Sequence, residues 1–139
     1  MKLLKPVILL ACVISLVSCL GNTGSEPTVI TEPLGRSYYY ITNQSESNLN
    51  VTYKIANFAV DSTVAVPTNS TTKVFQLARS NFPAPSEAFD NLRFFMQSSD
   101  MTSPIFVVEP IVDENWNDIT AEGDTVKKYE LRLTEEDIE

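Results

Sequence analysis

The stretch NLNVTYKI at residues 48–55 decides the fold class of this chain. Its apolar residues alternate with polar ones, and they are Leu49, Val51, Tyr53 and Ile55. In an extended strand successive side chains point to opposite faces, so one face here is apolar and the other polar. The alternation predicts a strand with its apolar face in a core and its polar face in water.

Strand-like segments flank this stretch on both sides. Residues 37–42 are rich in β-forming side chains, and the polar residues 43–47 predict a hairpin that joins them to 48–55. A second strand pair is predicted at 62–66 and 71–78, with a proline-containing turn between the two strands. We therefore expect each of these pairs to form neighbouring antiparallel strands.

The C-terminal half of the chain continues the strand pattern. Alternation or short apolar runs predict strands at 92–96, 105–108 and 128–133. The apolar spacing at 86–96 also fits a helix face, and we expect a short helical turn over 86–90 before the strand. About seven short antiparallel strands without a long helix predict an all-β fold, a single β-sandwich of immunoglobulin-like type, with a small β-barrel as the alternative.

Composition narrows the chemistry that the chain can carry out. None of the 139 residues is histidine, which removes the commonest general base and the commonest zinc ligand. The formal net charge is -8, and an acidic chain is repelled by nucleic acid and by anionic lipid headgroups. We expect no nucleic-acid partner, no metal and no other cofactor.

The N-terminus has the features of an export signal. Lys2 and Lys5 precede an apolar run at 7–17, which is shorter than the roughly 20 residues that span a bilayer. The run ends in Leu-Val-Ser-Cys at residues 16–19, which resembles the lipobox of bacterial lipoproteins. The resemblance covers residues 1–19 and implies a signal peptide at 1–18. It also implies that Cys19 is acylated and anchors the protein to membrane lipid in a bacterial cell envelope.

The domain organisation follows from this boundary. Residues 19–35, rich in Gly, Ser, Thr and Pro, are expected to be the lipidated cysteine and a flexible tether. Residues 36–134 form the sandwich domain, and the acidic tail at 135–139 is expected to fray. Leu20 replaces the Asp that is usual for inner-membrane retention, and residues 20–26 lack an acidic cluster. We therefore expect the protein at the outer membrane, facing the periplasm.

Three aromatic residues are candidates for contact with a partner protein or a glycan. They are Trp116, Tyr39 and Phe82, because exposed aromatic rings stack on sugars and anchor protein interfaces. Trp116 lies in the acidic stretch 113–124, and the pattern favours a Trp116 that plugs the loop into the core. The stretch is interpreted as a solvated loop in preference to a calcium site, because its spacing does not match a calcium loop.

Two short motifs predict covalent modification. Asp-Ser-Thr at 61–63 and Asp-Thr-Val at 124–126 resemble the motif at which some Gram-negative bacteria O-glycosylate exported proteins. The resemblance implies acceptor hydroxyls on Ser62 and Thr125.

The function expected from these features is binding without catalysis. The sandwich would contact another envelope protein or a glycan through its end loops or through an exposed edge strand. One alternative is a glycan hydrolase that depends on two carboxylates, which can act without histidine. The other alternative is a structural or inhibitory subunit of an envelope complex.

Overall fold

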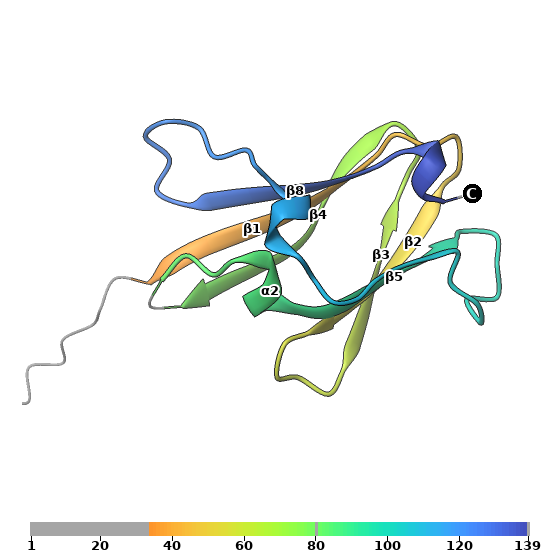
Figure 1. Ribbon diagram of the computed structural model, residues 1–139, viewed down its shortest axis with the longest axis horizontal. Coiled ribbons are helices and arrows are strands. Elements are labelled where there is room, and N and C mark those ends of the chain that lie inside the picture. The colour runs from red at the N-terminus through yellow and green to blue at the C-terminus, as the bar shows by residue number, and fades with distance from the viewer. Residues whose placement is uncertain (1–33, 80, 139) are drawn as a thin grey trace, which may run out of the picture. The chain divides into compact units, whose positions relative to one another are not determined.

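A computed structural model describes residues 34–79 and 81–138, which fold into two four-stranded sheets. The strands are β1 (Gly35–Asn43), β2 (Leu49–Ile55), β3 (Asp61–Val66), β4 (Ser70–Arg79), β5 (Phe89–Met96), β6 (Phe106–Val108), β7 (Asn117–Asp118) and β8 (Lys127–Leu133). One sheet has the order β4-β1-β8-β7, and the other has the order β3-β2-β5-β6. The sheets pack face to face around one core (Figure 1), so the predicted all-β sandwich is confirmed.

Strand β2 shows how the sequence pattern produces the core. Leu49, Val51 and Tyr53 are buried in the hydrophobic cluster between the sheets. On the outer face, the hydroxyl groups of Thr52 and Thr63 are hydrogen-bonded across strands β2 and β3 at 2.9 Å. The alternation at 48–55 therefore predicted both faces of this strand.

The two predicted strand pairs are wrong, because both loops cross between the sheets. Residues 44–48 lead from β1 in one sheet to β2 in the other, and residues 67–69 lead from β3 back to β4 in the first sheet. Asn43 stabilises the first crossing: its buried side-chain amide donates to the carbonyl oxygens of Ser47 and Val66 at 2.8 and 3.1 Å. The true hairpin joins β2 to β3.

Two finer features of the prediction also differ from the structure. Strands β1 and β8 pair in parallel, from Ser37 opposite Lys127 to Asn43 opposite Leu133, although all pairs were expected to be antiparallel. Strands β1 and β2 lie in different sheets, whereas an immunoglobulin constant-type domain keeps its first two strands in one sheet. A period-two pattern identifies the buried face of a strand, but it does not specify which strand lies beside it.

Three short helical elements connect the strands: α2 (Pro85–Ala88), η1 (Asp113–Asn115) and η2 (Glu135–Asp137). The helical turn expected over 86–90 is α2, which ends at Ala88 because β5 begins at the next residue. Proline is favoured at the first helical position, and the backbone N–H of Ala84 donates to the Glu87 carboxylate at 2.8 Å.

The acidic tail is ordered through residue 138, contrary to the expected fraying. Helix η2 is capped because the backbone N–H and the hydroxyl of Thr134 donate to the Asp137 carboxylate at 2.7 and 2.9 Å. The Glu135 carboxylate accepts the backbone N–H of Glu46 at 2.9 Å, and Ile138 packs against the core. These contacts hold the C-terminal residues against the sandwich.

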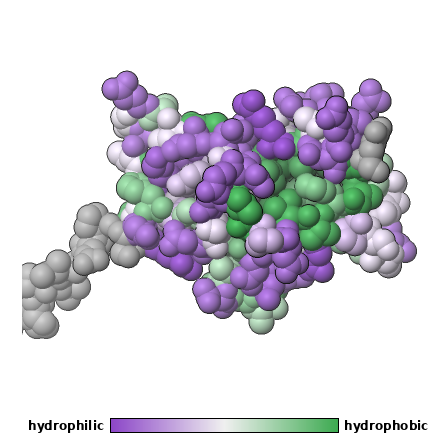
Figure 2. Space-filling model, viewed as in Figure 1, coloured by the Kyte–Doolittle hydropathy of each residue, from purple (hydrophilic) through white to green (hydrophobic). Residues whose placement is uncertain are grey.

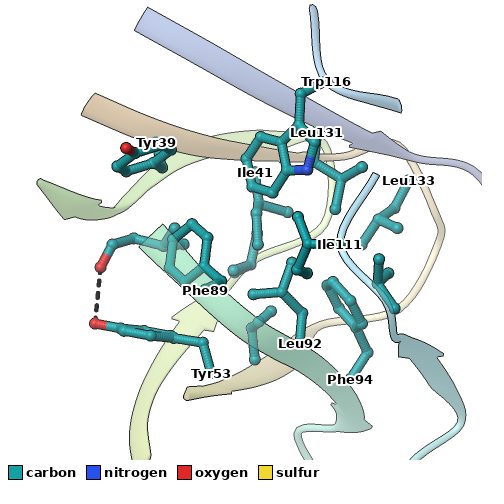
Figure 3. Packing of buried hydrophobic residues seen from close by; sticks show 14 of the residues in the cluster. Tyr39, Ile41, Tyr53, Phe89, Leu92, Phe94, Ile111, Trp116, Leu131 and Leu133 are labelled. Carbon is teal, nitrogen blue, oxygen red and sulfur yellow. Dashed lines mark hydrogen bonds between the residues drawn. The ribbon is translucent and has the colours of Figure 1, made fainter. Parts of the chain in front are cut away.

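The core is aromatic near the start of β1 and largely aliphatic beyond it (Figure 3). Phe89 packs against Tyr39, Tyr53, Phe75 and Trp116, with ring centroids 5.0–5.9 Å apart. The hydroxyl groups of the two buried tyrosines are satisfied, because Tyr39 donates to the Pro83 carbonyl at 2.8 Å and Tyr53 donates to the Val74 carbonyl at 2.9 Å. The other part of the core is formed by residues such as Ile41, Leu49, Val66, Leu92 and Leu133.

Candidate functional site

A groove of about 430 Å³ lies between strands β6 and β8, where the edges of the two sheets face each other. Its apolar lining comes from Phe106, Val107, Val108, Pro110, Leu131 and Leu133. Its polar lining comes from Glu109, Asn115, Arg132 and Asp137. Figure 2 shows hydrophobic residues gathered between the two sheets and bordered by hydrophilic ones. The groove is therefore lined by both apolar and polar groups, a combination that is found in binding sites.

Both strands that border the groove have an edge without a neighbouring strand in the described chain. β6 is the last strand of its sheet. β7 is only two residues long and pairs with Tyr129 and Glu130, so no strand covers the next three residues of β8 on that side. Uncovered strand edges expose backbone groups that can pair with another chain.

The backbone of Arg132 faces this uncovered side. The carbonyl of Leu133 accepts the Gln44 N–H on the β1 side, and the carbonyl of Lys128 accepts the Ile119 N–H on the β7 side. Successive residues of a strand direct their backbone groups to opposite sides, so Arg132 shares the side of Lys128. The N–H and C=O of Arg132 are therefore placed to pair with an added strand.

The charge around the groove is mainly acidic. Glu109 and Asp137 line it, and Glu136 precedes Asp137 in the chain. The basic side chain that lines it, Arg132, donates to the buried Glu130 carboxylate at 2.7 Å. The groove therefore favours a ligand that combines apolar and basic groups.

Two of the three candidate contact aromatics are buried: Trp116 packs into the core as its pattern favoured, and Tyr39, a candidate for contact with a partner, is buried as well. Tyr39 is 0% exposed and Trp116 is 5% exposed. Trp116 stacks on Phe89 at 5.9 Å, so the ring fills the core from its loop and presents no face to a partner. Burial in the aromatic cluster also raises the pKa of the Tyr39 hydroxyl above its usual value of 10.0.

Phe82 remains exposed, but it lies away from the groove lining. Its segment passes close to the start of β1, where a Cβ atom on Gly35 would lie 2.7 Å from the Phe82 backbone nitrogen. Phe82 is exposed whereas Tyr39 and Trp116 are buried, so the three residues do not form one contact surface.

The structure distinguishes the two predicted glycosylation sites. Ser62 is half-buried in β3, opposite Tyr53. Thr125 is exposed in the loop before β8, next to Asp124, whose carboxylate accepts the Lys128 ammonium at 2.8 Å. Thr125 is the more accessible acceptor, and its glycosylation stays a prediction. Cys19 and the signal peptide lie outside the described residues.

Three of the five carboxylates in the stretch 113–124 bind neighbouring protein groups. Asp113 accepts the backbone N–H and the hydroxyl of Ser86 at 2.8 and 2.9 Å. A hydrogen bond from Lys127 at 2.6 Å lowers the pKa of Asp118 to about 2. The hydrogen bond from Lys128 lowers the pKa of Asp124. Within residues 34–79 and 81–138, no group of three His, Cys, Asp or Glu side chains is placed to hold a metal ion.

No family model, curated protein or solved structure matches this chain. The described residues contain no helix with the length and apolar character needed to cross a membrane. The groove is therefore the candidate functional site, and the sequence did not predict it. One signal for it was present: Ile-Phe-Val-Val at 105–108 has no polar alternation, although it forms an edge strand.

Proposed function

We propose that this protein is a lipid-anchored component of a bacterial envelope, and that its sandwich binds an extended segment of another envelope protein without catalysis. The observation that carries this proposal is the groove, which places apolar side chains beside two uncovered strand edges. Acylation of Cys19 supplies the anchor. Two or more acyl chains hold a protein at a bilayer stably, whereas one chain gives marginal binding.

Addition of a strand is the binding mode that this geometry supports. An extended segment in line with β7 would pair with the backbone of Arg132. Alternate side chains of that segment would face the apolar residues that line the groove, including Val107 and Leu133. Main-chain hydrogen bonds then supply affinity, and the side-chain pockets supply specificity.

A protein ligand suits the groove better than a glycan or a hydrolase substrate. Sugar binding uses exposed aromatic faces, and the aromatic ring in the groove, Phe106, is half-buried. Hydrolysis by two acids would need both Glu109 and Asp137 to face the substrate. The Asp137 carboxylate is already engaged by two hydrogen bonds from Thr134.

Site-specific photo-crosslinking in cells tests the groove. A photoreactive residue at exposed Val107 should crosslink to one envelope protein through a segment that carries apolar and basic residues. The matched control places the same group at Ala65, which is exposed on β3 at the other edge of the same sheet. Crosslinks of equal yield and identity at both positions, or none at Val107, would contradict the proposed groove.

The anchor has a separate test in the mass of the mature protein. We expect a chain that begins at Cys19 and carries the mass of a diacylglycerol and a further acyl group. The same spectrum shows whether a hexose is present on the peptide that contains Thr125. A mature chain without acyl groups would contradict the anchor and leave the groove test intact.

A further inference from the structure

The four most exposed large apolar side chains in the described residues lie in loops at one end of the sandwich. They are Val60, Leu34, Phe58 and Phe82, at 72%, 65%, 61% and 46% exposure. Leu34 immediately precedes β1, Phe58 and Val60 lie between β2 and β3, and Phe82 follows β4. We call this region the apolar end, which comprises residues 34–36, 54–61, 79, 81–90 and 119–128.

Strand register shows that these segments meet at the same end. Gly35 at the start of β1 lies opposite Arg79 at the end of β4. In the other sheet, Ile55 at the end of β2 lies opposite Phe89 at the start of β5. The backbone N–H of Ala56 donates to the Ala88 carbonyl at 2.9 Å, which links two of the loops.

Charge distinguishes the apolar end from the rest of the molecule. The segments that define it contain five basic and five acidic side chains, and some of them form ion pairs, including Lys54 with Asp90 at 3.3 Å. Asp113 and Asp118 lie outside these segments but bond to Ser86 and Lys127 within them. The opposite end comprises residues 43–48, 67–70, 97–105 and 134–138 and has five acidic and no basic side chains. The excess of acidic side chains, which would repel an anionic lipid surface, therefore lies at the opposite end and not at the apolar end.

The chain that leads to the anchor joins the domain at this same end. Leu34 is the first described residue, and it follows Cys19 by 15 positions. Fifteen residues span at most about 50 Å when fully extended, so acylated Cys19 keeps the apolar end within that distance of the bilayer. This step depends on the anchor in the proposed function.

We propose that the apolar end docks on the lipid bilayer and inserts the side chains of Phe58, Val60, Phe82 and Leu34 into the interface between headgroups and acyl chains. Apolar and aromatic side chains are stabilised at that depth, and the mixed charges around them add little repulsion from the headgroups. The acidic end then points away from the membrane, because it lies at the other end of the strands (Figure 1).

The test uses the full lipidated chain in phosphatidylcholine vesicles. Cys19 is the only cysteine of the mature chain, so Ala59→Cys supplies one free thiol for an environment-sensitive dye within the apolar end. Ser98→Cys supplies the matched position at the opposite end, and both native residues are exposed. We expect lipids with brominated acyl chains to quench the dye at position 59 and to leave the dye at position 98 unquenched.

A double substitution tests whether the apolar side chains cause the docking. F58S/V60S should abolish the quenching at position 59, and the control V107S, which changes an exposed valine of the groove, should preserve it. Circular dichroism and the unfolding midpoint of each variant verify that the domain stays folded. Equal quenching at positions 59 and 98 would overturn the proposal. A dimer that F58S/V60S converts to a monomer would also overturn it, because the side chains would then contact a second copy.

The failure of docking can be distinguished from the failure of the proposed function. Acylated Cys19 with no selective quenching at position 59 would overturn docking alone. A Cys19 without acyl groups would overturn both the anchor and the docking. The crosslink at Val107 is an independent measurement of partner binding in the groove, and F58S/V60S should leave its yield unchanged.

Discussion

The two ends of the sandwich are built from the same strands but present different surfaces. The apolar end has balanced charge and the four most exposed large apolar side chains. The acidic end, which comprises residues 43–48, 67–70, 97–105 and 134–138, has five carboxylates and no basic side chain. The net charge of -8 therefore describes neither end. The position of the charged side chains, more than the net charge of the chain, determines which surface can approach lipid.

The buried residues near the two ends of the sandwich also differ in kind. Near the apolar end, Phe89 lies at the centre of an aromatic cluster. Near the acidic end, the buried Asn43 side chain binds the turn through hydrogen bonds to Ser45, Ser47 and Val66. One end is thus stabilised mainly by ring packing and the other by a buried polar network, and substitutions can test each separately.

The largest effect is expected for Phe89→Ala in the aromatic cluster. Removal of a buried Phe ring should lower the free energy of unfolding by about 4 kcal/mol, because several neighbouring rings lose contacts and a cavity remains. Urea denaturation measures the loss. Leu92→Ala, three residues along the same strand and also fully buried, is the matched aliphatic change and should cost about 3 kcal/mol. A smaller loss for Phe89→Ala than for Leu92→Ala would refute the central role of the cluster.

The next effect is expected for Asn43→Ala in the polar network. The change removes the Asn43 hydrogen bonds to the carbonyl oxygens of Ser47 and Val66 and from the N–H of Ser45, and should cost about 3 kcal/mol. Asn48→Ala is the control at the same end: its exposed side chain accepts one hydrogen bond, from the Thr68 N–H. Equal losses for the two variants would mean that burial of the Asn43 network contributes nothing.

A smaller effect is expected for Tyr39→Phe, and it depends on pH. The substitution leaves the Pro83 carbonyl without its donor and should cost about 1–2 kcal/mol near neutral pH. Burial raises the pKa of Tyr39, so the wild-type domain gains stability from the protonated hydroxyl below 10.0 and loses it as the pH rises above that value.

Urea midpoints measured on both sides of pH 10.0 test this linkage. The wild-type free energy of unfolding should fall more steeply with rising pH than that of Tyr39→Phe, by up to about 1.4 kcal/mol per pH unit for one ionising group. Parallel pH profiles would show that ionisation of Tyr39 is not coupled to folding.

The sequence predicted the strands of this fold better than their arrangement. Alternation located the buried face of β2 because burial follows the period of the side chains. It did not predict the parallel pairing of β1 with β8, because either direction of the neighbour satisfies the same pattern. It also did not establish the burial of Tyr39, since consecutive tyrosines at 38–40 offer the core either face.

The groove was beyond sequence reasoning for a physical reason. Strands β6 and β8 were each expected, but the groove exists because β7 stops after two residues and leaves Arg132 uncovered. The length of β7 depends on contacts that are distant in sequence. In contrast, Phe82 was proposed from the sequence as a contact residue, and its side chain is exposed.

The smallest effect is expected for Asp118→Asn, which tests the ion pair between Asp118 and Lys127 near the apolar end. The Lys127 ammonium holds the pKa of Asp118 at about 2, below the usual 3.8. A lowered pKa means that the ionised carboxylate stabilises the fold above pH 3.8 and that this contribution is lost as the pH falls toward 2. Both side chains are partly exposed, so solvent screening keeps the effect small.

Unfolding midpoints of the wild type, Asp118→Asn and Lys127→Gln, measured above and below pH 3.8, isolate this pair. Both variants should lose less stability on acidification than the wild type, because each removes the interaction that depends on the ionised carboxylate. The difference should shrink at high salt, which screens exposed charges. If both variants retain the wild-type acid profile, the ion pair orients the two side chains without stabilising the fold.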